Sequence, residues 1–477
     1  MKKIFLFIFL IFISGCSDSF EKIEISDLKV EENPENVLSC MLSFKTDRSI
    51  ETVVRYFSDD HSGYEIQGAE TTDHYFFIWG MRADSTYNIQ IFSAKDLEHP
   101  VYSTTFNTGV LPGSLPALEL TENKPEKVSD GFVLFTYYNY PEEFSKPVAL
   151  MVDTDGEVVW YFEYYMAGFN VIGNVQFVDE TQTVMMSISK GPNMADIPAE
   201  EAIEIDLEGH VLWKSAELKS VHNGPDNWHH MYRLLDDDSI VTLKPDYIGN
   251  VVSDRILNLD RDYNILWSWR YADFFEVPEC PAGEICDWTH SNHVNMFKEK
   301  KTCYINSRNF SKYFKIDMDS GNILWTFGKE GDFSMTSAHP DPWIEFAHAP
   351  QITFLNDNES EILFYDNGSD ERGFSRIIKY RIDEEKLTSD IVFEYDGSNE
   401  NKKWSTPFWG SAKEMENGNF FITAGNFEFS EKSRIFEVTD KGETVWELVL
   451  LEPDEDVMIA LYNSWKFKPD LKKLFTR

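Results

Sequence analysis

The stretch 148-VALMVDTDGEVVW-160 decides the fold, because its pattern returns five more times along the chain. It consists of an apolar run, a turn of the Asp-x-x-Gly type and a second apolar run that ends in an aromatic residue. Two short apolar runs separated by turn residues predict a β-hairpin. The remaining copies lie at Ala202 to Trp213, Ile256 to Trp267, Tyr313 to Trp325, Ile377 to Phe393 and Ile435 to Trp446.

The spacing of these copies predicts the architecture. Their closing aromatic residues are 53, 54, 58, 68 and 53 residues apart. Further hairpins with polar turns lie between copies, at Met231 to Leu243, Ile352 to Tyr365 and Ser411 to Thr423. Each unit therefore holds about four strands, and six such units predict an all-β protein with a six-bladed β-propeller. A β-helix would have shorter periods, and a sandwich would not repeat one turn six times.

The chain before the repeats predicts a separate domain. Short alternating strands separated by turns run from residue 22 to residue 111, which indicates a small N-terminal β-sandwich. Within it, Gly80 to Tyr87 resembles the turn before the Tyr-corner strand of fibronectin type III domains. The propeller is expected to occupy residues 112–477.

The N-terminus predicts export and lipid anchoring. Lys2 and Lys3 precede the apolar run Ile4 to Ile13, which is too short for a stable membrane span. The following Ser-Gly-Cys resembles a bacterial lipobox, so residues 1–15 are interpreted as a lipoprotein signal peptide, Cys16 as the lipidated residue and residues 16–21 as a tether. The expected location is the periplasmic face of the outer membrane or the cell surface, with the lipid as the sole membrane contact. An ordinary secretory signal is the alternative.

Composition limits the partners. The net charge is −39, which argues against binding to nucleic acid or to an anionic membrane surface. Any anion site must therefore be a local exception built from a few cationic side chains.

The other four cysteines fall into two groups. Cys280 and Cys286 bracket Pro-Ala-Gly-Glu-Ile, and in an exported protein this spacing predicts a small disulfide, with two free thiols as the alternative. Cys40 and Cys303 lie in apolar runs typical of strands, which indicates buried, inert thiols.

Polar residues recur in phase with the repeats. The steps from His230 to His290 and from His290 to His348 are 60 and 58 residues, and each His precedes the hairpin of its unit. Because inner strands of a propeller converge on its axis, these side chains are expected to meet there. Asn292 lies beside His290, and Arg308 ends the return strand of the same hairpin. Neutral imidazole, carboxamide and guanidinium groups can bind and attack a tetrahedral oxyanion without a metal.

These residues resemble the motifs of the bacterial aryl-sulfate sulfotransferases, the family that does not use the nucleotide sulfate donor. With the N-terminal sandwich, the propeller and the paired cysteines included, the resemblance covers nearly all of the mature chain, and seven short stretches carry its motifs. They are Asp287-Trp288-Thr289-His290-Ser291-Asn292, Ser307-Arg308, Phe314 to Asp317, His348-Ala349-Pro350, Asp366-Asn367-Gly368, Ser375 to Tyr380 and Ile422 to Gly425.

The resemblance implies a ping-pong transfer of a sulfuryl group from an aryl sulfate to a phenol. It implies that His348 is the nucleophile and forms a sulfohistidine. His290, Asn292 and Arg308 would then hold the sulfuryl oxygens, and His230 would serve as an acid–base group at the phenolic oxygen. His229 remains a possible substitute for His230.

Further expectations concern an aromatic residue, two departures from the family pattern, and the cofactor and partner. Trp288 is a possible stacking partner for an aryl ring, although propeller aromatics usually lie in the core. His293 and Met231 stand where the family more often has other residues. No cofactor or metal is expected, since no Asp or Glu recurs in phase with the His residues. A homodimer is possible. The competing interpretations are a non-catalytic binding propeller and a metallohydrolase.

Overall fold

The computed structural model describes residues 23–61, 63–140, 148–164, 171–189, 198–199, 201–215, 228–425, 432–452 and 457–470. Its regular elements are almost all strands, with short 3₁₀ turns at Tyr271–Asp273 and Ser398–Glu400. No helix in these ranges is long and apolar enough to cross a membrane. The expected signal peptide, Cys16 and the tether lie outside the described residues.

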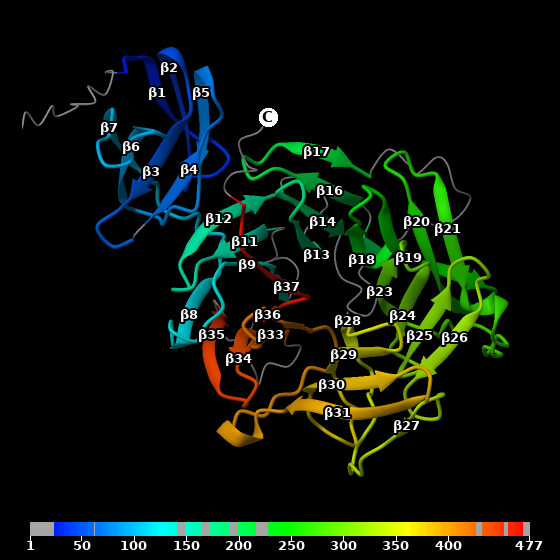
Figure 1. Ribbon diagram of the computed structural model, residues 1–477. Helices are drawn as coiled ribbons and strands as arrows, with labels where there is room; N and C mark the ends of the chain where they lie inside the picture. The colour runs from blue at the N-terminus through cyan, green and yellow to red at the C-terminus, as the bar shows by residue number, and fades with distance from the viewer. Residues whose placement is uncertain are drawn as a thin grey trace, which may run out of the picture.

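The N-terminal strands form two facing sheets, as expected for a β-sandwich (Figure 1). Tyr87 forms the expected corner, because its hydroxyl accepts a hydrogen bond from the backbone N–H of Arg82 at 2.9 Å. The expected boundary near residue 112 falls between the strands Tyr102–Asn107 and Ala117–Asn123. One sheet has the order β1 (Ile25–Glu32), β2 (Cys40–Ile50), β5 (Thr71–Ile78), and the other β4 (Tyr64–Gln67), β3 (Thr52–Phe57), β6 (Thr86–Ser93), β7 (Tyr102–Asn107).

Six antiparallel sheets surround a common axis and form the six-bladed propeller that the repeat predicts (Figure 1). From the axis outward, the first three blades are β37 (Ser464–Phe467), β9 (Phe132–Thr136), β11 (Val148–Val152), β12 (Val158–Glu163); β13 (Val171–Val178), β14 (Thr183–Ser189), β16 (Glu201–Ile205), β17 (Val211–Lys214); and β18 (Trp228–Leu234), β19 (Ile240–Ile248), β20 (Val251–Leu259), β21 (Ile265–Arg270). The other three are β23 (Ser291–Phe297), β24 (Thr302–Ser307), β25 (Lys312–Asp317), β26 (Ile323–Phe327); β28 (His348–Phe354), β29 (Glu359–Asp366), β30 (Arg376–Asp383), β31 (Thr388–Tyr395); and β32 (Ser411–Glu414), β33 (Phe420–Ala424), β34 (Arg434–Val438), β35 (Thr444–Leu451).

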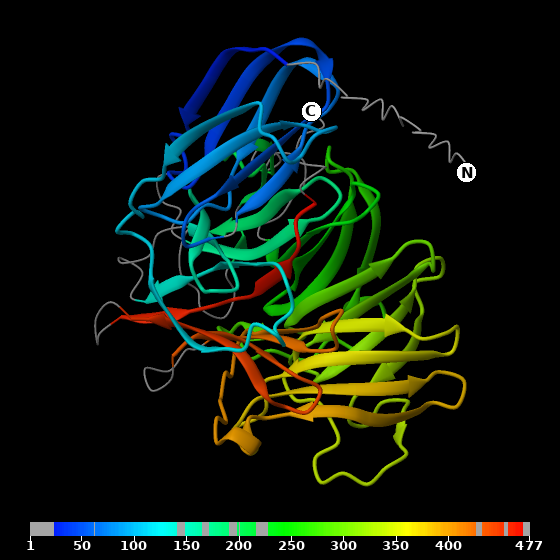
Figure 2. The ribbon, with the colours of Figure 1, turned by 60° about the vertical axis from the view of Figure 1, so that its left-hand side comes forward.

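Strands from both ends of the domain close the ring. The C-terminal strand β37 is the innermost strand of the first blade and pairs with β9. At the other closure, β8 (Ala117–Asn123) pairs with β35 on the outer edge of the last blade, beside which it lies in Figure 1. Figure 2 shows the N-terminal sandwich above the ring of blades. Short strands extend the blades or link their edges, namely β10 (Tyr138–Tyr140) with β36 (Met458–Ala460), β15 (Pro198–Ala199) with β18, β22 (Cys286–Asp287) with β20, and β27 (Ser334–Met335) with β31.

The repeated sequence is the outer hairpin of each blade. The stretch at 148–160 spans β11 and β12, and its five copies span the equivalent third and fourth strands of the other blades. The closing aromatic residues pack in the blades' apolar layers, as with Trp160, Trp325 and Trp446, which are buried. The pattern is regular because every outer hairpin buries one face against the neighbouring blade.

The sandwich packs directly on the edge of the first two blades. Phe77 and Trp79 belong to the same buried cluster as Phe132 and Trp160 of the first blade. The contact also carries charge, since Arg82 lies 2.7 Å from Asp153 in the turn between β11 and β12.

The innermost strands begin with irregular pairing. Register shifts interrupt β13, β18, β23 and β28 close to their first residues. Left-handed backbone angles occur at these points, with φ of 61° at His230, 41° at His290 and 44° at Ala349. Such bulges bend a strand and re-aim its side chains. They lie where the propeller places its in-phase histidines, so the backbone strain coincides with the candidate site.

Candidate active site

His348 opens β28, and its neighbours fix its protonation. The ring Nδ1 lies 2.6 Å from Oδ1 of Asn367 and 3.2 Å from the backbone oxygen of Phe346. The Asn367 amide nitrogen donates to the backbone oxygens of Thr406 and Trp409 at 2.6 and 2.8 Å, so its oxygen must face His348. Because both partners of Nδ1 are acceptors, Nδ1 carries the proton and Nε2 keeps a lone pair.

The His348 ring is also held neutral. Its side chain is buried, and desolvation together with the charges of Arg308 and His290 lowers its pKa to about 3, although the Asn367 contact opposes this. A neutral imidazole with an unprotonated Nε2 is a competent nucleophile at neutral pH.

His229 and His230 form a chain with a carboxylate, and His230 is close enough to His348 for the two rings to interact electrostatically. Nε2 of the buried His229 lies 3.0 Å from Oδ1 of Asp254, and its Nδ1 lies 2.6 Å from Nδ1 of His230. If His229 donates to the carboxylate, its Nδ1 accepts from His230, which leaves Nε2 of His230 with a lone pair. Burial and the neighbouring histidines lower the pKa of His230 well below its usual value, so this ring is neutral too.

His290 completes the cluster. The centroid of its ring lies 5.1 Å from that of His230. Its Nδ1 hydrogen-bonds the carboxylate of Asp287. Asp287 belongs to β22, which pairs in parallel with β20, and the Cys280–Cys286 disulfide precedes it directly. The predicted disulfide is therefore confirmed, and it closes the loop that presents Asp287 to His290.

Arg308 supplies a cation beside these rings. Its backbone N–H donates to the backbone oxygen of His290 at 3.1 Å, so the return strand does bring the two residues together. The guanidinium carbon lies 4.8 Å from the ring centroid of Phe346 and 5.2 Å from that of Phe408. The side chain forms no ion pair within the described ranges, and its buried Nε has no hydrogen-bond partner there. Its Nη1 donates to Oδ1 of Asn309 at 3.2 Å and its Nη2 to the backbone oxygen of Pro407 at 3.4 Å, which uses two of the five N–H groups. A cation packed against aromatic rings with N–H groups to spare suits an anionic ligand.

The environment of Asn292 differs from the one expected of a residue that binds the sulfuryl oxygens. Its amide nitrogen donates to the backbone oxygen of Ala347 at 2.9 Å, and its oxygen accepts from Asn306 at 2.8 Å. Asn306 also donates to the Ala347 oxygen at 2.6 Å. The two amides therefore fix the residue before His348, and Asn292 retains only one N–H group for a ligand.

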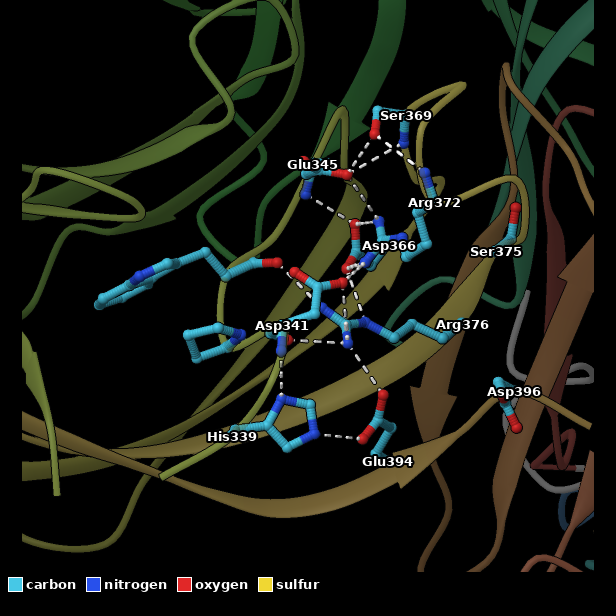
Figure 3. A network of polar contacts seen from close by, with 12 residues as sticks. His339, Asp341, Glu345, Asp366, Ser369, Arg372, Ser375, Arg376, Glu394 and Asp396 are labelled. Carbon is cyan, nitrogen blue, oxygen red and sulfur yellow. Dashed lines mark hydrogen bonds and ion pairs between the residues drawn. The ribbon is translucent and has the colours of Figure 1, made fainter. Parts of the chain in front are cut away.

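A buried ionic network supports the segments on either side of His348 (Figure 3). Asp366, next to Asn367, is fully buried and binds Arg372 at 2.6 Å and Arg376 at 2.8 Å. The same carboxylate accepts from the backbone N–H of Glu345 at 2.7 Å. The network thus joins the chain that enters β28 to the chain that follows β29, and so holds His348 against Asn367.

The structure separates the remaining predicted residues from this cluster. Trp288 packs against Phe310 with ring centroids 5.9 Å apart, in the apolar layer between the third and fourth blades. Its position gives no support to contact with a substrate. His293 lines an axial cavity below the cluster, and Cys40 and Cys303 are free, buried thiols as expected.

Sequence reasoning missed the partners of the histidines. Asp254 and Asp287 are both close to them, although neither recurs in phase, because they reach the cluster from β20 and β22. Asn367 stood within a matching motif but received no role, and Asn306 showed no signal at all. Over the described parts of the chain, no group of three or more His, Cys, Asp or Glu residues is arranged to hold a metal ion.

Comparisons with known proteins identify the family. The model of the arylsulfotransferase (ASST) family matches residues 118–455. No curated protein sequence matches the chain. Solved structures are similar at low levels: a chain of a nidogen/laminin complex (11% identity, TM-score 0.38, covering 70% of this chain and 97% of that one) and a presumed 6-phosphogluconolactonase from Bacteroides fragilis (9%, 0.35, 88% and 99%). These two likenesses are too weak to support any argument about function. The family model spans well over half of the chain and includes every residue of the histidine cluster, so the protein belongs to the arylsulfotransferase family.

Proposed function

We propose that the protein transfers a sulfuryl group from an aryl sulfate to a phenol without a nucleotide, through a sulfohistidine on Nε2 of His348. Family membership supports sulfotransferase activity in general. The observation that carries the finer proposal is the contact between His348 and Asn367, because it leaves Nε2 as the free, unprotonated nitrogen of a neutral ring.

In the first half-reaction, Nε2 of His348 attacks the sulfur of the aryl sulfate. A nitrogen–sulfur bond forms, the sulfur–oxygen ester bond breaks, and the phenolate leaves with the bonding electron pair. Negative charge on the sulfuryl oxygens is stabilised by the Arg308 guanidinium, which has unused N–H groups. The proton stays on Nδ1, which donates it in a hydrogen bond to the amide oxygen of Asn367. This hydrogen bond stabilises the positive charge that develops on the ring.

In the second half-reaction, a phenol attacks the sulfur of the sulfohistidine. Nε2 of His230 takes the phenolic proton, and the nitrogen–sulfur bond returns its electron pair to His348. The chain from His230 through His229 to Asp254 supports the positive charge on His230. The proton collected there can protonate the phenolate that leaves in the next cycle, so the two half-reactions balance.

We also propose that the enzyme acts outside the cytoplasm as a lipoprotein anchored through Cys16. The lipobox-like sequence and the disulfide support this location, since disulfides persist in oxidising compartments. Metabolic labelling with a radioactive or clickable fatty acid, compared between the wild type and Cys16→Ser, tests this. Label on the Cys16→Ser protein would contradict it.

The activity is tested with para-nitrophenyl sulfate as donor and phenol as acceptor, in the absence of any nucleotide. The expected result is release of nitrophenolate with formation of phenyl sulfate, and loss of both by at least about 1000-fold in His348→Gln. His210→Gln, in an exposed turn of the second blade, is the matched control and should retain activity. Unchanged turnover in His348→Gln, with the fold intact, would exclude the proposal.

A further inference from the structure

A cavity of about 300 Å³ runs along the propeller axis below the histidine cluster. His348 and Asn292 contribute to its wall, and so do two cations, Arg233 and Lys413. Arg233 follows His230 by three residues along β18, which places its backbone roughly 10 Å further along the axis. These two cations are therefore distinct from Arg308, which does not line this cavity.

Neither cation has a carboxylate partner among the residues that the structure describes. Most buried cations of this acidic protein are paired, as with Lys466 and Glu437 at 2.7 Å or Arg376 and Asp366 at 2.8 Å. Arg233 has only Oδ1 of Asn295, at 3.4 Å, and neither Arg233 nor Lys413 forms an ion pair with any part of the chain that the structure describes.

The positive charge of Lys413, like that of Arg233, is not balanced by an ion pair with any residue that the structure describes. Its ammonium lies 4.7 Å from the ring centroid of Trp465. Burial lowers the pKa of Lys413, and the positive charge of Arg233 adds to this effect. Both side chains line the same cavity. Two desolvated cations without an acidic partner are unfavourable, and an anion between them would relieve both costs.

Neutral groups of the wall are arranged to keep Arg233 turned toward the cavity. The amide nitrogen of Asn295 donates to the hydroxyl of Tyr313 at 2.9 Å and to the backbone oxygen of Pro350 at 2.8 Å. Its oxygen thereby faces both Nε2 of His293, at 3.3 Å, and Nη1 of Arg233, at 3.4 Å, and it engages only one of the five guanidinium N–H groups. His293, beside them, is held neutral, since burial lowers its pKa to about 3.

Acidic residues nearby lie at the turns that end the inner hairpins. The charge of Asp236 stabilises the charged form of Arg233, and the charges of Asp179 and Glu416 stabilise that of Lys413. In each case the attraction acts over a longer distance than an ion pair. They reduce the positive potential without occupying the space between the cations.

We propose that Arg233 and Lys413 form a second oxyanion site in the axial cavity, which binds inorganic sulfate or the sulfonate group of a small organic molecule. The cavity is large enough for either, because it exceeds the volume of one sulfate ion and has apolar wall residues such as Phe297 and Trp465.

Isothermal titration of the full chain tests this site without any need for turnover. The Arg308→Gln protein serves as the parent, so that binding beside the histidines is removed. Titrated with sodium sulfate and separately with sodium benzenesulfonate in a chloride-free buffer, this parent should bind at least one of the two anions at one site. Adding Lys413→Gln or Arg233→Gln should weaken that binding by at least about 10-fold, while adding Lys301→Gln on the surface should leave it unchanged.

The outcomes separate the alternatives. Binding of sulfate identifies a free inorganic ion as the ligand, and binding of benzenesulfonate alone identifies an organic sulfonate. Loss of all binding in the Arg308→Gln parent, or equal binding in the parent and in both folded cavity variants, would overturn the proposal. Thermal melting of each variant checks the fold, and two cavity variants are used so that one failure to fold does not remove the test.

Discussion

The side chain of Asn367 holds the ring of His348 in one tautomer, because its oxygen lies 2.6 Å from Nδ1 and its nitrogen is used by two backbone oxygens. This relationship decides which nitrogen of His348 carries the proton. In the proposed mechanism Nε2 is therefore the nitrogen that attacks sulfur, and the amide fixes the proton on Nδ1 without charging the ring.

Asn367→Ala should lower kcat by roughly 100-fold, since the His348 ring loses the partner that selects its tautomer. Steady-state kinetics measure this, and nitrogen NMR of the histidine rings should show a mixture of tautomers at His348. Asn358→Ala, at an exposed hairpin tip of the same blade, is the control and should change neither. Full activity of Asn367→Ala would refute the role of this contact.

Arg308→Lys should reduce kcat/KM by roughly 10- to 100-fold, although the charge is kept. An ammonium has neither the planar fork that contacts two sulfuryl oxygens nor the flat surface that packs between Phe346 and Phe408. Arg55→Lys in the sandwich is the matched control, because Arg55 pairs with Glu65 on the surface. If both variants behaved alike, Arg308 would not be the group that binds the sulfuryl oxygens.

The depressed pKa of His348 predicts a specific effect of pH on stability. The unfolded state has an ordinary His pKa of about 6.5, whereas the folded state has about 3, so the unfolded chain binds more protons between these values. The stability linked to His348 is thus complete above pH 6.5 and is lost as the pH falls toward 3. Chemical unfolding at several pH values should show the wild type losing more stability in this window than His348→Gln. Parallel curves would contradict the depressed pKa.

Asp366→Asn should destabilise the protein by about 3 to 5 kcal/mol, because it leaves Arg372 and Arg376 buried without their common carboxylate. The kcat should fall as well, since the network joins the segments that carry His348 and Asn367. Asp319→Asn removes a solvent-exposed pair with Lys301 and should leave the stability nearly unchanged. Equal losses of stability in the two variants, measured by denaturant unfolding, would disprove the network's role.

The propeller could be predicted from the sequence because the outer hairpin of every blade has the same pattern of buried residues. The number of copies of this pattern gives the number of blades. The sequence was also sufficient to bring His230, His290 and His348 together, since equivalent strand starts meet at the axis. It did not identify Asp254 as a partner of the histidines, nor Asp287, although Asp287 lies in a matching motif, because both reach the histidines from strands outside the repeat phase. Nor could it assign the proton of His348, which depends on how the amide of Asn367 is turned by contacts with a loop 39 and 42 residues away in sequence.

The most direct test of the account is to locate the sulfuryl group on the enzyme. Full-length protein is mixed with para-nitrophenyl sulfate without acceptor, quenched rapidly under alkaline conditions, and examined by intact and peptide mass spectrometry. The account predicts one sulfuryl group per chain, on His348, which disappears when phenol is added before the quench. Nitrophenolate release with no adduct, or an adduct on His290 or His230 in place of His348, would contradict it.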